Sequence, residues 1–252
     1  MALSLTQTEA VGRLVKPGMR VASFGYPDIV APQEMWGNIL GTTHRPVEVR
    51  KDSESICKRH GLESRPIPDA HSFFKLKSCE LDVYDIVRER GCEILCDLNY
   101  EVPMMHWTGY LQKYDIVLDV GTAEHCFNIG QAMINMASMV KEGGYIIHEN
   151  PANWGNHGFY NLNPTLFYDF YTDNGFEVEE LKLVTRDGRQ VVVPPTQRFK
   201  FPPEEMNIFC LAKRVRVQNF IYTTQTKYKQ IPTPGISGER AASERAKEIV
   251  NG

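Results

Sequence analysis

Residues 114–119 read YDIVLD, a run of apolar side chains that ends in an aspartate. Two further runs have the same form, LDV at residues 81–83 and EILCD at residues 93–97. The runs begin at residues 81, 93 and 114, a dozen residues or more apart, which is about the spacing that a crossover between parallel strands needs. Strands that are apolar throughout are typical of parallel sheets covered by helices on both faces. The sequence therefore predicts a Rossmann-like open α/β sheet, mostly parallel.

The flanking segments supply the other elements of a seven-stranded sheet. Apolar spacing predicts helices at residues 4–15, 53–60, 129–141 and 164–172. Further strands are predicted at residues 20–24, 145–148, 176–184 and 207–212, the last two adjacent to each other. We expect Gly143 to cap the helix that begins at residue 129, because glycine is favoured at helix C-termini.

Three segments fall outside this pattern. Residues 29–76 hold four prolines and few continuous apolar faces, so we interpret them as an insertion or cap after the first strand. Residues 186–205 also hold four prolines and are predicted to run over the surface. From residue 215 to residue 252 the chain is polar, which predicts a mobile arm or tail, or one that joins a homo-oligomer through Phe220, Ile221 and Tyr222.

Composition excludes several classes of protein. The 28 basic and 31 acidic side chains give a net charge of −3, which argues against a nucleic-acid partner. No stretch approaches the roughly 18 apolar residues of a membrane span, and residues 1–16 lack the core of a secretory signal, so we expect a cytoplasmic protein with no membrane partner. The six cysteines show no C-x-x-C pair and are interpreted as reduced thiols.

Three segments, taken in order, resemble class I S-adenosylmethionine-dependent methyltransferases. They are KPGMRVASFG at residues 16–25, YDIVLD at residues 114–119 and KEGGYII at residues 141–147. Two more elements, E-H-x-F-N at residues 124–128 and H-G-F-Y at residues 157–160, are similar to a broad group within that family. The family usually follows its first strand with G-x-G-x-G, of which this chain keeps only the first glycine.

This resemblance covers residues 11–214 apart from the insertion, and implies a methyltransferase-like domain at residues 1–214. It implies transfer of a methyl group from S-adenosylmethionine to an oxygen, or failing that a nitrogen, of a small molecule such as a sugar or a secondary-metabolite intermediate. Two alternatives stay open. One is a non-catalytic methyltransferase-like binding or scaffold module, and the other is a different nucleotide-cofactor enzyme on the same kind of sheet.

Candidate cofactor residues follow the strands, because ligands of open α/β sheets bind at the carboxyl ends of the strands. The resemblance assigns the ribose hydroxyls to Asp82, with Asp85 as the fallback, and the adenine to the turn after the third strand. The carboxylate after the fourth strand and the residues that follow it are expected to line the transfer site. The full expected set is Gly25, Tyr26, Asp82, Asp97, Leu98, Asn99, Asp119, Gly121 and Glu124.

The loop at residues 150–163 mixes aromatic rings with amides, which suits a hydroxylated acceptor. Its expected substrate-binding residues are Asn153, Asn156 and Tyr160. Histidine is a neutral base at cellular pH, so we expect His157, ahead of His125, to accept the acceptor's proton.

Metal ligation was weighed for four residues that the loops could bring together. Their spacing matches no ligand signature, so no metal is expected. The four are Asp119, His125, His148 and His157.

Overall fold

The computed structural model describes residues 2–40, 46–101, 109, 111–185 and 187–229. The helices are α1 (Leu5–Leu14), α2 (Gln33–Leu40), α3 (Ser53–Arg59), α4 (Ala70–Leu76), α6 (Ile129–Ser138), α7 (Pro164–Asp173) and α8 (Thr226–Lys229), with a 3-10 turn η1 (Ala123–His125). The strands are β1 (Ala2–Leu3), β2 (Arg20–Phe24), β3 (Asp28–Ile29), β4 (Glu80–Asp85), β5 (Ile94–Leu95), β6 (Tyr114–Asp119), β7 (Val140–Pro151), β8 (Phe176–Thr185), β9 (Gln190–Val192) and β10 (Met206–Arg214).

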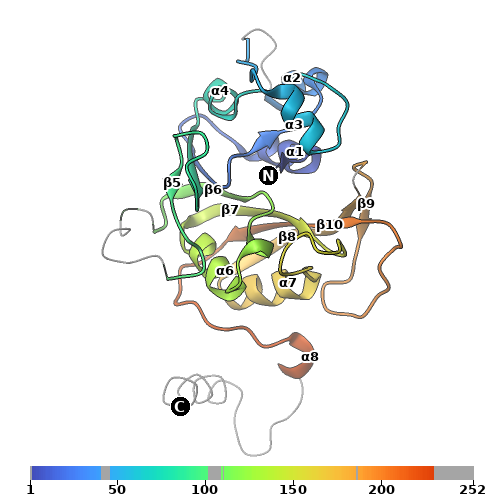
Figure 1. The fold of residues 1–252 in the computed structure, drawn as a ribbon. Coiled ribbons are helices and arrows are strands. Elements are labelled where there is room, and N and C mark those ends of the chain that lie inside the picture. Colours follow the sequence, from blue (N-terminus) through green and yellow to red (C-terminus); the bar gives the residue numbers. More distant parts are fainter. Residues whose placement is uncertain (1, 41–45, 102–108, 110, 186, 230–252) are drawn as a thin grey trace, which may run out of the picture.

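A central sheet in the order β5-β4-β2-β6-β7-β10-β8-β9 carries the fold (Figure 1). The first five strands of this order, β5, β4, β2, β6 and β7, pair in parallel. Strand β10 pairs antiparallel with both β7 and β8. The predicted open, mostly parallel α/β sheet is confirmed, and so is the pairing of the two late strands. It has eight strands rather than seven in the described chain, because β9 forms a hairpin with β8 inside the segment predicted as a surface excursion.

Helices cover both faces of the sheet, with α1 to α4 on one side and α6 and α7 on the other (Figure 1). Part of the segment predicted as an insertion belongs to this core, since Trp36 of α2 and Phe73 and Phe74 of α4 pack with the sheet residues Val83 and Ile116. The sequence placed this segment outside the core. Its prolines divide it into short helices, none long enough to show a clear helical period.

The turn between α6 and β7 also differs from its prediction. Helix α6 ends at Ser138, and Gly143 lies inside β7 at a φ of +80°. The pairing of β6 with β7 shifts register here, and a Cβ on Gly144 would lie 2.9 Å from the carbonyl oxygen of Asp115. The glycine pair therefore forms an irregularity within the strand rather than a helix cap.

The described part of the C-terminal arm, residues 215–229, packs on α7 of its own chain. The Phe220 ring stacks on Phe170 at 6.2 Å, and Asn174 exchanges two hydrogen bonds with the backbone of Ile221. These residues therefore contact the body of their own chain, and Phe220 packs against its core. Residues 230–252 lie outside the described residues, and assembly through the arm stays a prediction.

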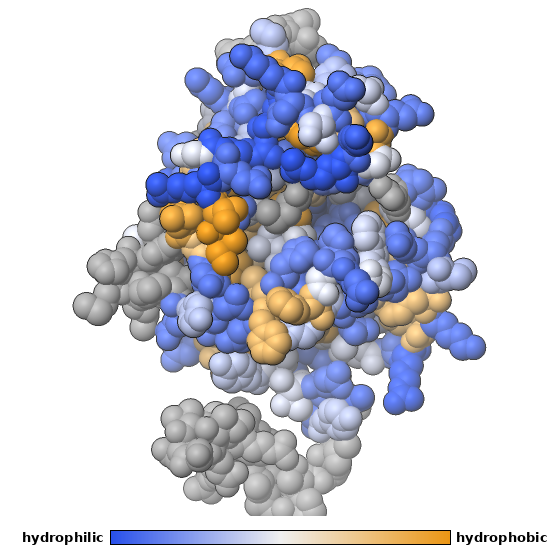
Figure 2. Space-filling view, viewed as in Figure 1, coloured by the Kyte–Doolittle hydropathy of each residue, from blue (hydrophilic) through white to orange (hydrophobic). Residues whose placement is uncertain are grey.

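Hydrophobic residues on the face shown in Figure 2 form separate patches on a mostly hydrophilic surface. Within the described ranges, no helix has the length and apolar composition that crossing a membrane requires.

Candidate functional site

A small pocket lies at the carboxyl ends of β2 and β4, beside the position where the strand order reverses. β2 has β4 on one side and β6 on the other, which is the switch point where open α/β sheets bind ligands. The pocket measures about 110 Å³. It is lined by Phe24, Gly25, Tyr84, Asp85, Ile86, Cys96, Asp97, Leu98, Asn99, Thr122, His125 and Cys126. We call it the strand-end pocket.

Gly25 shapes one wall of the strand-end pocket. Its φ of +83° is in the left-handed region that favours glycine, and its N–H donates to the Tyr84 carbonyl at 2.7 Å. The hydroxyl of Thr122 donates to the Phe24 carbonyl at 2.7 Å, so the ends of β2 and β6 are joined at this point. Gly121, after β6, also has a positive φ, of +85°.

The acidic residue at the end of β4 is Asp85, and it lines the strand-end pocket. Asp82, the first choice from sequence, lies within the strand. Its carboxylate accepts hydrogen bonds from Tyr114 at 2.6 Å, Arg20 at 3.2 Å and Lys113 at 3.3 Å. The strand runs further than its apolar core LDV indicated, so Asp85, the fallback residue, stands at its carboxyl end in place of Asp82.

Asp82 is thus a stabilising residue, and we expect Asp82→Asn to lower the free energy of unfolding by roughly 1.5–3 kcal/mol at pH 7. Burial opposes ionisation, but the hydrogen bonds from Tyr114 and Lys113 hold the pKa of Asp82 below its ordinary value. A depressed folded-state pKa stabilises the fold above the unfolded value, near 4, and this stabilisation is lost as the pH falls. Urea unfolding at pH 7 and pH 3 checks this. If the free energies of unfolding of variant and wild type differed by the same amount at both pH values, this prediction would be contradicted.

The turn after β5 brings three expected residues to the strand-end pocket. Asp97 accepts from the backbone N–H of Asn99 at 2.9 Å, and Leu98 is buried. The Asn99 side chain accepts from the backbone N–H of Asn128 at 3.0 Å, which ties this turn to the start of α6. By contrast, Tyr26 lies elsewhere: its hydroxyl donates to Asp69, the N-cap of α4, at 2.7 Å.

A second pocket of about 360 Å³ adjoins the first. It lies over the ends of β6 and β7, and its polar lining includes Ser4, Glu124, Glu149 and His157. His125 lines both pockets. We call it the histidine pocket, and His125 is the residue that it shares with the strand-end pocket.

Two buried carboxylates, Asp119 and Glu124, lie close together, and Glu124 lines the histidine pocket. Asn150 donates to both, at 2.8 Å to Asp119 and 2.9 Å to Glu124. Burial, with the charge of Asp119 nearby, raises the pKa of Glu124 to about 8. Burial also acts on Asp119, but its hydrogen bond to His148 at 2.7 Å holds its pKa below the ordinary value. Glu124 therefore binds a proton more tightly than Asp119 does.

Sequence reasoning assigned no binding or catalytic role to several polar residues around these carboxylates, and it weighed His148 only as a metal ligand. His148 joins Asp119 to the hydroxyl of Tyr171, which lies 2.5 Å from the second ring nitrogen. Glu149 accepts from Ser4 at 2.5 Å and from Asn207 at 3.0 Å. The available signal was the triplet HEN at residues 148–150, three polar residues that continue an apolar strand.

The predicted substrate residues do not line the histidine pocket. Asn153 holds the backbone of the 202–206 segment, accepting from Met206 at 2.8 Å and donating to Glu204 at 2.8 Å. Asn156 is exposed in a turn at a φ of +56°. Tyr160 donates to the Phe127 carbonyl at 2.8 Å. Trp154 from the same loop does line the pocket.

No family model matches the chain, and no curated protein matches it either. Solved structures do. The trans-methyltransferase CalH in complex with SAH is 14% identical, with a TM-score of 0.45, over 82% of this chain and 54% of CalH. The 1,6-didemethyltoxoflavin-N1-methyltransferase of Burkholderia thailandensis is 12% identical, with a TM-score of 0.44, over 83% of this chain and 77% of that one. A SAM-dependent methyltransferase from Aquifex aeolicus is 9% identical, with a TM-score of 0.40, over 80% of this chain and 87% of that one.

The chain thus spans about half the length of CalH. At these identities the likeness concerns the fold, and it says nothing of which residues act or on what. S-adenosylmethionine-dependent methyltransferases are nevertheless what the chain is similar to, in its sequence motifs and in these solved structures alike.

Proposed function

We propose that the chain is an S-adenosylmethionine-dependent methyltransferase that acts on a hydroxyl oxygen, or failing that a nitrogen, of a small molecule. The observation that carries the proposal is the pair of pockets at the switch point, which meet at His125. Methyl transfer needs two ligands side by side, and two adjoining pockets supply two places.

The strand-end pocket suits the adenosine half of the cofactor. Asp85, Asp97 and Leu98 all line this pocket. In the proposed complex Asp85 accepts from the ribose hydroxyls, Asp97 accepts from the adenine amino group, and Leu98 packs on the adenine ring. Gly25 and Gly121 flank the strand ends where the rest of the cofactor would lie, and both lack a side chain that would fill that space. Gly25 is the one glycine that the chain keeps from the family's G-x-G-x-G loop, and Gly121 after β6 is a second glycine at the same edge of the sheet.

The histidine pocket suits the acceptor. When bound, the cofactor supplies a sulfonium methyl group: the O–C bond forms as the S–C bond breaks, and the bond's electron pair stays on sulfur. The acceptor's O–H bond must also break, and its proton leaves to solvent. His157 and His125 are proposed as the catalytic residues that assist this proton loss, with Glu124 beside them. Holding both ligands in line supplies the remaining rate enhancement.

Calorimetric titration of the full chain with S-adenosylhomocysteine, and separately with NAD, tests this function. We expect binding of S-adenosylhomocysteine and none of NAD. Radiolabelled methyl transfer from S-adenosylmethionine to a panel of hydroxylated sugars and phenols then tests catalysis. No binding of either nucleotide would favour a scaffold module, and binding of NAD alone would favour another nucleotide enzyme.

A further inference from the structure

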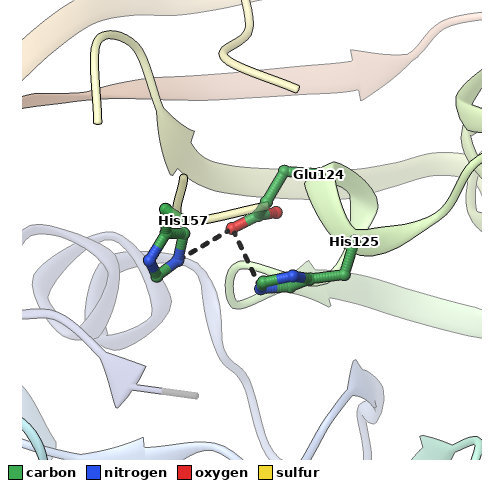
Figure 3. A group of neighbouring side chains, drawn as sticks. All are labelled: Glu124, His125 and His157. Atoms are coloured by element: carbon green, nitrogen blue, oxygen red, sulfur yellow. Dashed lines mark ion pairs between the residues drawn. The ribbon is translucent and has the colours of Figure 1, made fainter. Parts of the chain in front are cut away.

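Three side chains point toward one another at the floor of the histidine pocket (Figure 3). Glu124 and His125 come from η1, and His157 comes from the loop after β7. Their ligand atoms all lie within 4.8 Å of one another. The Nε2 atoms of His157 and His125 lie 3.7 Å and 3.9 Å from the same Glu124 oxygen, Oε1.

These separations are longer than hydrogen bonds. Oε1 is buried and has no hydrogen-bond partner among the described residues, whereas Oε2 accepts from Asn150. An unpaired buried carboxylate oxygen is costly, so something is expected to complete its environment. The two imidazoles are 41% and 47% exposed, which leaves the space between them open to the histidine pocket.

We propose that Glu124, His125 and His157 bind one divalent first-row transition-metal ion, such as Zn²⁺. Bonds of about 2.0–2.2 Å from such an ion set its ligand atoms roughly 3–3.6 Å apart. The two imidazole nitrogens, at 3.7 Å and 3.9 Å from Glu124 Oε1, are close to this separation from the carboxylate oxygen. Two imidazoles and one carboxylate select transition metals over Mg²⁺, which prefers oxygen ligands. Three protein ligands leave further coordination positions open toward the pocket.

The surrounding residues hold this arrangement in place. Asn150 fixes the Glu124 carboxylate by its other oxygen, as residues behind a metal ligand commonly do. The backbone N–H of Phe159 donates to the Glu124 carbonyl at 2.9 Å, and a Cβ on Gly158 would lie 2.8 Å from that carbonyl oxygen. The glycine therefore lets the loop that carries His157 lie directly against η1.

The role of the ion rests on the proposed function. An acceptor hydroxyl bound at an open position would have its pKa lowered by the metal charge, so its proton is released to solvent more readily. The histidines then assist proton loss as ligands of the ion.

Metal binding is tested on the full chain after chelator treatment, without nucleotide. We titrate Zn²⁺ and Mg²⁺ by calorimetry, and Co²⁺ by its visible absorption. We expect one Zn²⁺ or Co²⁺ per chain and much weaker Mg²⁺ binding. His125→Asn, His157→Asn and Glu124→Gln should each weaken Zn²⁺ affinity by more than about tenfold. His71→Asn, a histidine beside Tyr26 and away from the pocket, is the matched control and should bind as wild type does.

Either of two results would overturn the ion site: no Zn²⁺ or Co²⁺ binding to the wild type, or binding that none of the three ligand variants weakens. Thermal unfolding, measured on every variant, shows that each is folded. S-adenosylhomocysteine affinity, measured on the wild type, separates the two proposals. If the chain binds the nucleotide but no metal, only the ion site is overturned, and if it binds metal but no nucleotide, only the proposed function is overturned.

Discussion

The His157→Asn variant is expected to lose about 10²- to 10⁴-fold in turnover, the usual contribution of a group that assists proton transfer. His157 lines the histidine pocket, which we propose for the acceptor, with its ring 5.2 Å from that of His125 and its Nε2 within 4 Å of Glu124 Oε1. It does not line the strand-end pocket, so affinity for S-adenosylhomocysteine should be nearly unchanged. Single-turnover methyl transfer, with calorimetry of the nucleotide, separates the two quantities.

The matched control for this variant is His71→Asn, which should keep wild-type turnover. A His157→Asn enzyme with normal turnover would place the chemistry elsewhere, with His125→Asn the next variant to measure. A loss of nucleotide affinity equal to the loss of turnover would indicate a disturbed fold rather than a missing catalytic group.

Replacing Asp85 by alanine is expected to weaken S-adenosylhomocysteine binding by about 1.5–3 kcal/mol, the range for losing a hydrogen bond to a charged group. That corresponds to roughly a tenfold to 150-fold rise in Kd. The reason is position: Asp85 ends β4 at the strand-end pocket, where a ribose would offer two hydroxyl donors. Calorimetric titration measures the change directly.

Asp82→Ala provides the contrast on the same strand. Its carboxylate is already bound by Arg20, Lys113 and Tyr114, so the variant should lose stability but keep its nucleotide affinity. The reverse result would restore the assignment that the sequence favoured. In that case Asp82→Ala would bind S-adenosylhomocysteine more weakly, and Asp85→Ala would bind it as tightly as wild type does.

The positions of the parallel strands along the chain could be predicted from the sequence because buried strands form short apolar runs. Residues 20–24 form β2 as predicted, and the run at 114–119 forms β6. Glycines and polar residues that follow such strands mark the ligand-binding edge, which is why Gly25, Asp97, Leu98 and Asn99 lie together in the strand-end pocket. This information is local, and the chain carries it residue by residue.

Which polar residue serves which purpose was decided by the tertiary structure. Asp82 and Asp85 look alike in sequence, and only the partners brought by β2 and β6 make one an ion-pair residue. Helices α2 and α4, within residues 29–76, belong to the core because the sheet offers them an apolar face. Glu124, His125 and His157 likewise meet only because the loop after β7 returns to η1, a contact across more than thirty residues that no local pattern encodes.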